Sequence, residues 1–539
     1  MDANRFMKRK ADIVLKCTLF VLLMFSFFLK GNGQNILPSP THVEQTASGY
    51  TIGNQMALTF DFGTSETADY VKNKLSRYIR FTDRKQTNHI FSLHIDKALT
   101  DLGTEGYILT VSPAGIAIKA GEEAGLFYGI QSLLQLFPEE VQAGKPYQLK
   151  GFQLAGLQIT DKPKYNWRGF MLDCATQYQT PELIKHYLDL MAMLKMNIFH
   201  WHLTETKGWR LEIKKYPELT KLGSNIGHGE GQQGYYSRKD IKDIVGYARR
   251  LHITVVPEID LPGHAQAALY VYPWLGCFNE RPNIEQGNGE AVFCAGKEQT
   301  YHFLEDVLDE VCELFPSEYV HLGQDEASKA NWQKCPDCQR TIRDNGLAGV
   351  DDLQKYFFSR LANHLKTKNK KAIAWGDIIY QEGIKLPDNT VIMWWNYRGH
   401  KDLEYQNALK DRYPVICNTN YYNYLNFTVD HWHRMQKEQS FDLRKTYEEN
   451  PVDFQNPPPL VMGMECSLWT WRITKKNMID RRVFPRIYSS AEQMWSTADR
   501  LSFSEFYKKI KAKYPLLKML GVEYGPALRE EVVPGFQWE

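Results

Sequence analysis

The sequence predicts an α/β fold in which a small α+β domain precedes a (β/α)8 barrel, the TIM barrel. From Trp167 onward, short apolar strands alternate with amphipathic helices about every 40 to 50 residues. Eight such units fit into roughly 340 residues, a size that this fold tolerates. Polar and aromatic side chains also gather where the strands end. A doubly wound sheet is the alternative, but no Gly-rich phosphate-binding turn follows its first strand.

Residues 1–33 are predicted to be a secretory signal peptide. Four basic residues lie within Arg5–Lys10, and Leu19–Leu29 is an apolar run. The small residues of Gly31–Gly33 place the expected cleavage before Gln34. The apolar run is shorter than the ~20 residues of a membrane span. The sequence therefore predicts export to the periplasm, the cell surface or the medium, without stable membrane insertion after cleavage.

Residues 35–160 are predicted to form the small α+β domain. The segments Tyr107–Val111 and Ile116–Ile118 have the apolar character of short strands. Apolar residues of Leu126–Leu136 recur at helical spacing, which predicts a helix.

Residues 161–539 are predicted to form the barrel. Thr180 and Pro181 give a helix start, and Ser237 with Asp240 forms a second one of the capping-box type. Residues 440–459 are expected to be an irregular insertion before the last strand. The expected strands are Arg168–Asp173, Ile198–Leu203, Thr254–Ile259, Tyr319–Leu322, Ala372–Trp375, Val391–Trp395, Val415–Asn418 and Leu460–Met464.

Composition narrows the class of partner. The chain has 539 residues, with 65 Lys and Arg against 63 Asp and Glu, so nothing favours nucleic acid. Its 13 Trp and 30 Tyr would suit sugar rings, although a large core also uses them. Cys335 and Cys338 form a CxxC without a second pair, which supports zinc only weakly. Cys277 and Cys294 could form a disulfide in an oxidising compartment, but spacing does not establish connectivity.

The segment His321–Glu326 contains the main candidate for catalysis. Asp325 and Glu326 lie side by side at the end of a predicted strand, where each negative charge disfavours ionisation of the other. Such a pair can keep one carboxyl protonated as an acid while its neighbour stays ionised. In a barrel, the active site forms at these carboxyl ends of the strands.

Four motifs resemble the family 20 glycoside hydrolases, the β-N-acetylhexosaminidases. The motifs, in chain order, are Trp167–Asp173, Asn197–Thr204 with Gly208–Arg210, Val256–His264 and His321–Glu326. Residues 35–160 resemble the small domain that precedes the barrel in this family. The resemblance implies release of terminal GlcNAc or GalNAc with retention, in which the substrate's 2-acetamido oxygen is the nucleophile. It implies a glycan substrate and no cofactor or metal.

The resemblance also implies roles for individual residues. Glu326 would be the general acid and then the base, and Asp325 would orient the acetamide N–H. Tyr424 would donate its hydroxyl to the acetamide oxygen, and His264 would couple to Glu326 through the carboxylate of the second-strand loop.

The remaining implied contacts are to the sugar. Trp375, Trp395 and Trp469 would form the walls around it. Arg168 would donate to its hydroxyls, because a guanidinium fork fits a vicinal pair.

The chain departs from the family pattern at several positions. Gln324 replaces a glycine, and Thr206 follows Glu205 where a second acid is usual. Asn426 and Trp471 stand where carboxylates usually hold the O4 and O6 hydroxyls of the sugar, with Arg472 beside Trp471. Together with Lys207, these residues suggest a substrate with an anionic substituent on O6, such as 6-O-sulfated GlcNAc.

Two other classes of function remain open. His200 and His202 face the same side of a strand and could ligate zinc, as in a metal-dependent amidohydrolase barrel. The altered sugar contacts would also fit a carbohydrate-binding protein without activity. Retention of Asp325, Glu326, Tyr424 and Arg168 favours the enzyme.

Overall fold

The chain forms two compact units. The first runs to Lys162 and includes the short segments Thr497–Arg500 and Lys511–Met519, and the second comprises the remainder. The sequence-based boundary between residues 160 and 161 assigns both short segments to the barrel domain. The computed structural model describes residues 35–61, 63–226, 233–284, 291–396, 402–430, 441–449, 452, 457–497 and 499–538.

The predicted signal peptide, residues 1–33, lies outside the described residues. Within the described parts of the chain, none of the helices has both the length and the apolar character needed to cross a membrane.

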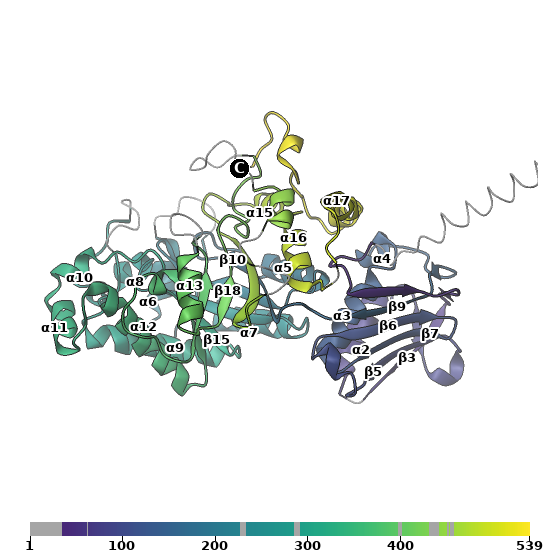
Figure 1. Cartoon of the computed structure of the whole chain (residues 1–539), viewed down its shortest axis with the longest axis horizontal. Helices are drawn as coiled ribbons and strands as arrows, with labels where there is room; N and C mark the ends of the chain where they lie inside the picture. Colours follow the sequence, from purple (N-terminus) through teal and green to yellow (C-terminus); the bar gives the residue numbers. More distant parts are fainter. Residues whose placement is uncertain are drawn as a thin grey trace, which may run out of the picture. The chain divides into compact units, whose positions relative to one another are not determined.

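The first unit is built on a mixed seven-stranded sheet (Figure 1). Its central hairpin pairs β6 (Tyr107–Ser112) with β7 (Gly115–Ala120), two strands that the sequence predicts. Helix α3 (Glu123–Leu134) packs on this hairpin, and a Cβ atom at Gly129 would lie 2.6 Å from Ile118, so only glycine permits the close approach. The strand order is β1 (His42–Gln45), β9 (Leu157–Asp161), β6, β7, β5 (Ile90–Ile95), β3 (Gln55–Phe60) and β4 (Arg80–Thr82).

The second unit is a closed barrel of eight parallel strands, which confirms the predicted fold. Each expected strand is present, with bounds that differ by a few residues at most. In barrel order the strands are β10 (Trp167–Asp173), β11 (Ile198–His202), β14 (Thr254–Leu261), β15 (Tyr319–Gly323), β16 (Lys371–Trp375), β17 (Thr390–Trp394), β18 (Val415–Cys417) and β19 (Val461–Leu468).

Two helix starts follow the sequence signals. Helix α5 (Pro181–Met193) begins after Thr180, whose side chain accepts a hydrogen bond from the Leu183 N–H. Helix α7 (Arg238–Arg249) begins with a reciprocal capping box between Ser237 and Asp240. The other helices that follow barrel strands include α9 (Glu298–Leu314), α12 (Val350–Thr367), α13 (Leu403–Lys410), α15 (Lys476–Val483) and α16 (Ile487–Trp495) (Figure 1).

Two connections differ from the expected pattern. Residues 376–389, all of them described, join β16 to β17 through the short turn η7 (Gly376–Ile379) and contain no α-helix. The expected irregular insertion at 440–459 contains a helix, α14 (Leu443–Glu448), which Asp442 caps. A helix of six residues is too short to show a clear apolar period, which is why the sequence pattern did not predict it.

The barrel interior changes from apolar to polar toward the carboxyl ends of the strands. Ile198 and Val256 lie in the apolar layer, and His200 and Glu258, two residues further along the same strands, lie in a buried polar layer. Residues two apart on a strand point to the same side, so both layers face the barrel interior. Gly169 leaves room for Glu465, whose carboxylate a Cβ atom there would meet at 2.4 Å.

Candidate active site

The Asp325–Glu326 pair is held in place by an unusual backbone turn at the end of β15. Gly323, Gln324 and Glu326 have φ values of 64°, 90° and 48°. A Cβ atom on Gly323 would lie 1.8 Å from Asp260 Oδ1, so glycine is required there. A non-glycine residue such as Gln324 in this region costs on the order of 1–3 kcal/mol, strain that is typical of active sites.

Hydrogen bonds hold the Gln324 side of this turn. The Gln324 N–H donates to Leu261 O at 2.7 Å, and Gln354 Nε2 donates to Gln324 O at 2.8 Å. The Gln324 side chain is fully buried and donates to Leu322 O. The departure from glycine is therefore accommodated inside the protein, where the Gln324 side chain is buried.

Asp325 and Glu326 have different surroundings. The Asp325 side chain is 13% exposed, whereas that of Glu326 is 56% exposed. Asp325 Oδ1 is buried and has no hydrogen-bond partner among the described residues. The Glu326 N–H donates to Asp377 Oδ1 at 3.2 Å, which fixes the backbone while leaving the carboxyl accessible. The pair thus offers one confined acceptor and one group open to exchange protons.

His264 lies between the pair and Glu205, so it faces the pair directly, whereas the expectation placed the carboxylate of the second-strand loop between His264 and Glu326. Its Nε2 is 3.5 Å from Asp325 and 4.0 Å from Glu326, and its Nδ1 is 2.7 Å from Glu205 Oε1. Burial opposes its charge, but the Glu205, Asp260 and Asp325 carboxylates outweigh burial and hold the pKa of His264 well above its usual value. A positive charge therefore stands beside the two candidate catalytic carboxyls.

Three further carboxyl groups lie close by with raised pKa values. Burial and then the Asp325 charge raise the pKa of Asp260 well above its usual range and that of Asp377 to about 6. Burial and then Asp377 raise the pKa of Glu404 to about 9. Sequence reasoning missed Asp377 and Glu404, which belong to no recognisable motif; the position of Asp377 two residues after Trp375 is the one available signal.

Four aromatic residues form a cage beside the pair. Tyr424 stacks on Trp395 with ring centroids 6.2 Å apart and lies 6.1 Å from Trp469. Trp375 lies 6.0 Å from Trp469 and donates to Glu258 at 2.8 Å, while Trp395 donates to Asp377. The structure therefore brings together Trp375, Trp395, Tyr424 and Trp469, as predicted. Burial raises the pKa of Tyr424 well above its usual value, so its hydroxyl remains a donor.

Arg168 is not part of this site, and the prediction that it contacts sugar is wrong. It lies near the amino end of β10, is fully buried, and donates to the carbonyls of Tyr165 and Lys195. Its guanidinium packs on Trp495 of α16. The physical reason is the two-residue strand period: Trp167 faces the barrel interior, so Arg168 faces the surrounding helices.

Asn426, Trp471 and Arg472 lie on the loops that follow β18 and β19. Asn426 Oδ1 is buried without a hydrogen-bond partner among the described residues. Trp471 is 60% exposed, and the Arg472 guanidinium lies 4.6 Å from its ring. The loop after β18 adjoins β19, because Tyr424 forms a β-bridge with Ser467 near the end of that strand.

His200 and His202 belong to the buried polar layer and not to an open metal site. His200 Nδ1 lies 2.7 Å from Glu465 and its Nε2 lies 3.2 Å from Glu258. Burial opposes the charge of His200, but the two carboxylates outweigh it and raise its pKa to about 10. Both histidine side chains are fully buried, so neither presents a nitrogen at the open rim of the barrel. The layer instead supports Trp375, which shares Glu258.

A closed parallel barrel with paired carboxyl groups and an aromatic cage at the carboxyl ends of its strands is the arrangement of a glycoside hydrolase. The model of glycosyl hydrolase family 20, catalytic domain, matches residues 165–498, and that of its domain 2 matches residues 33–162. The chain belongs to glycosyl hydrolase family 20.

Relatives and solved structures agree with this assignment. A β-hexosaminidase of Porphyromonas gingivalis is 34% identical over 93% of this chain, which spans 65% of that relative's length. A crystal structure of a β-N-acetylhexosaminidase from Bacteroides fragilis is 44% identical, with a TM-score of 0.86, and the match covers 94% of this chain and 99% of that one. An exo-β-N-acetylglucosaminidase of Vibrio harveyi in complex with N-acetylglucosamine is 27% identical, with a TM-score of 0.80 and coverage of 92% and 79%.

Proposed function

We propose that this chain is an exo-acting β-N-acetylhexosaminidase that releases terminal β-linked GlcNAc, or GalNAc, from glycans with retention of configuration. The observation that carries the proposal is the placement of Asp325 and Glu326 side by side, next to the His264 cation and the aromatic cage. A neighbouring-group reaction needs one carboxyl to transfer protons and a second to stabilise the acetamide, and this pair supplies both.

In the first step, the acetamide oxygen of the substrate attacks the anomeric carbon. The bond to the leaving oxygen breaks, and that oxygen takes the proton of Glu326, whose exposed carboxyl can reach it. The Asp325 carboxylate accepts the acetamide N–H as positive charge develops on the ring nitrogen of the oxazolinium ion. The Tyr424 hydroxyl donates to the acetamide oxygen and so orients it for attack.

In the second step, water attacks the anomeric carbon and gives a proton to Glu326. The bond to the oxazolinium oxygen breaks, and the acetamide is restored with its electron pair. The sugar leaves with its original configuration. Trp375 and Trp469 supply the apolar surface against which the acetamide methyl and the ring pack.

Hydrolysis of chromogenic substrates tests the proposal. We expect release of 4-nitrophenol from the β-GlcNAc glycoside, and no release from the β-glucoside, which lacks the acetamide nucleophile. A thiazoline mimic of the oxazolinium should inhibit strongly, as transition-state-like species do. Capture of a covalent sugar on an Asp or Glu would contradict the mechanism. Binding of the sugar without turnover would instead support a carbohydrate-binding protein.

We also propose that the chain is exported. The support is the basic start, apolar run and small residues of positions 1–33. Expression of the full chain with its leader in a Gram-negative host should give a mature protein that begins at Gln34 in the exported fraction. A cytosolic product that begins at Met1 would contradict export.

A further inference from the structure

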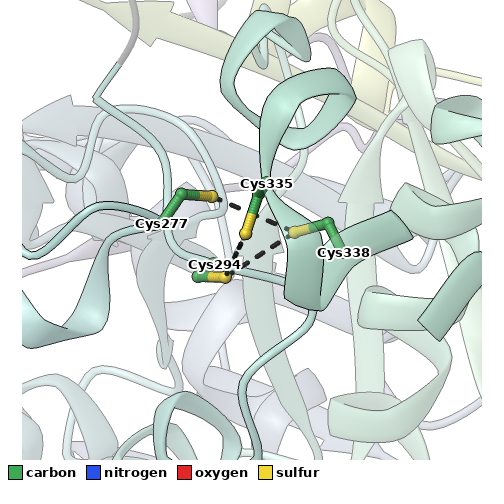
Figure 2. Close-up of side chains that lie close together, drawn as sticks. All are labelled: Cys277, Cys294, Cys335 and Cys338. Carbon is green, nitrogen blue, oxygen red and sulfur yellow. Dashed lines mark hydrogen bonds between the residues drawn. The ribbon is translucent and has the colours of Figure 1, made fainter. Parts of the chain in front are cut away.

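Four cysteines converge outside the active site. Cys277, Cys294, Cys335 and Cys338 point their sulfur atoms toward a common centre (Figure 2). The Sγ atoms are 3.9 Å apart for Cys277 and Cys338, 3.8 Å for Cys294 and Cys335, and 3.6 Å for Cys294 and Cys338. All four lie within 4.8 Å of one another.

These separations match a metal site and not a set of disulfides. A disulfide brings two sulfur atoms to about 2.05 Å. A tetrahedral zinc ion with Zn–S bonds of about 2.3 Å places its sulfur ligands ~3.8 Å apart. The three sulfur–sulfur distances agree with the separation expected around a tetrahedral zinc ion. Each of the four cysteines is a free thiol. Cys277 and Cys294, which the sequence offered as a possible disulfide, are both free and supply the second pair of thiols.

The backbone around the cluster is organised to present the sulfur atoms. Cys335 precedes α11 (Pro336–Asp344), and Cys338 lies in its first turn, so the CxxC bends around one point. On the other side, an antiparallel bridge between Gly276 and Phe293 aligns the two following residues, Cys277 and Cys294.

Two neighbours make this arrangement specific. A Cβ atom at Gly296 would lie 2.2 Å from the Cys338 nitrogen, so only glycine allows the two segments to approach. The Lys297 ammonium donates to Gly276 O at 2.5 Å, beside Cys277. This cation and the positive end of α11 both favour thiolates over neutral thiols.

We propose that Cys277, Cys294, Cys335 and Cys338 bind one Zn²⁺ ion as a closed, structural site. Four protein thiolates leave no position for water or substrate, so the ion takes no part in the hydrolysis. Its role is mechanical. Cys277 and Cys294 lie in the loop after β14, which also carries His264, and Cys335 and Cys338 follow β15 and the Asp325–Glu326 pair. The ion would therefore join the two loops that supply the acid pair and its cation.

One hydrogen bond already joins these loops. Trp332 Nε1, on α10 (Ala330–Lys334), donates to Phe293 O at 2.9 Å. Zinc at the adjacent cysteines would add a connection that does not depend on the packing of a single side chain.

The experiment measures metal in the full-length protein, purified without added metal or an affinity tag that binds metal. Elemental analysis should give about one zinc per chain. Replacement of zinc by Co²⁺ should produce the thiolate charge-transfer and d–d absorption bands of a tetrahedral thiolate site. The double variant Cys335→Ser/Cys338→Ser should lose the zinc and the cobalt bands. Cys312→Ser, a half-buried cysteine of α9 outside the cluster, is the matched control and should keep both.

Alkylation in denaturant without reductant distinguishes the competing states without any variant. A zinc site releases four thiols that all react with iodoacetamide, whereas two disulfides leave all four cysteines unmodified. Protein with unmodified cysteines and no zinc overturns the proposal in favour of disulfides. Four free thiols without zinc, or with iron in its place, also overturn it.

Discussion

The residues around the proposed sugar site fall into two groups that are built differently. The reaction group consists of His264, Asp325, Glu326 and Tyr424, and the outer group consists of Asn426, Trp471 and Arg472. In the reaction group, His264 is paired with the partly buried Glu205, and the Glu326 backbone N–H donates to Asp377, while the Glu326 side chain itself is 56% exposed. In the outer group, Trp471 is 60% exposed, and the guanidinium of Arg472, the next residue in the chain, lies over its ring.

This difference suggests that the reaction group determines the type of reaction and that the outer group determines the choice of substrate. Charges that must act on a transition state are effective only when they are held in place before the reaction, because reorientation would cost the energy they supply. Contacts to peripheral hydroxyls can sit on exposed loops, where substitution costs little stability. The departures from the family pattern follow this division: buried hydrogen bonds hold Gln324, whereas Asn426 and Trp471 lie on the loops that follow β18 and β19.

The largest effect is expected from Glu326→Gln, in the reaction group. Loss of the proton donor should lower kcat on an unactivated GlcNAc disaccharide by about 100- to 10,000-fold. The side chain is 56% exposed, so the melting temperature should stay close to that of the wild type. The loss should shrink on a dinitrophenyl glycoside, whose leaving group departs without a proton. A wild-type rate on the disaccharide would remove Glu326 from the role of acid.

Tyr424→Phe tests the residue that we propose donates its hydroxyl to the acetamide oxygen. Removal of one positioned donor is expected to lower kcat by about 100- to 1,000-fold, with a smaller change in KM. Tyr421→Phe, on the same loop, is the matched control and should keep activity close to that of the wild type. Equal losses in both variants would show that the loop, and not the Tyr424 hydroxyl, matters.

The sequence predicted the strands and the acid pair because both depend on residues that are close together in the sequence. Strand period, capping residues and adjacent carboxyls are properties of neighbouring positions. Strand period places Trp167 and Arg168 on opposite faces, but which of the two faces the barrel interior depends on packing that the structure shows.

Other features depend on contacts that spacing does not encode. Asp377 and Glu404 acquire raised pKa values from burial against distant segments. The cysteine cluster joins Cys294 to Cys335 across 41 positions, and a bridge between Gly276 and Phe293 sets its geometry. A lone CxxC gives no indication of such partners.

Glu404→Gln tests whether the buried carboxyls behind the reaction group carry a proton. The folded pKa of Glu404, about 9, exceeds the ~4.3 of an unfolded chain, so the folded state binds the proton over this interval and the unfolded state does not. Wild-type stability should therefore fall as pH rises from about 4.3 to about 9. The glutamine variant lacks this loss.

The variant should be more stable than the wild type at pH 9 by at least ~1.4 kcal/mol, the equivalent of one pKa unit, with a smaller difference at pH 5. Guanidinium unfolding at both pH values measures it. Asp388, whose side chain is 76% exposed and pairs with Lys366, supplies the control variant Asp388→Asn, which should not show a gain that grows with pH. A constant difference across the pH range would mean that Glu404 does not titrate there.

The smallest effect concerns the outer group and the identity of the sugar. A carboxylate near O6 would repel an anionic substituent, whereas a Trp indole N–H, an Asn amide and a guanidinium can receive one. We therefore predict that 4-nitrophenyl β-GlcNAc with a 6-sulfate keeps a kcat/KM within about tenfold of the unsulfated compound, a limit of ~1.4 kcal/mol.

Arg472 is exposed, so Arg472→Gln should lower the sulfated-to-unsulfated ratio of kcat/KM by no more than about fivefold, the range of an exposed ion pair. Lys508→Gln, on the exposed face of α17 (Phe503–Lys511), should leave the ratio unchanged. A sulfated substrate hydrolysed more than tenfold worse would show that Trp471 fills space, and that the outer group selects something other than an anion.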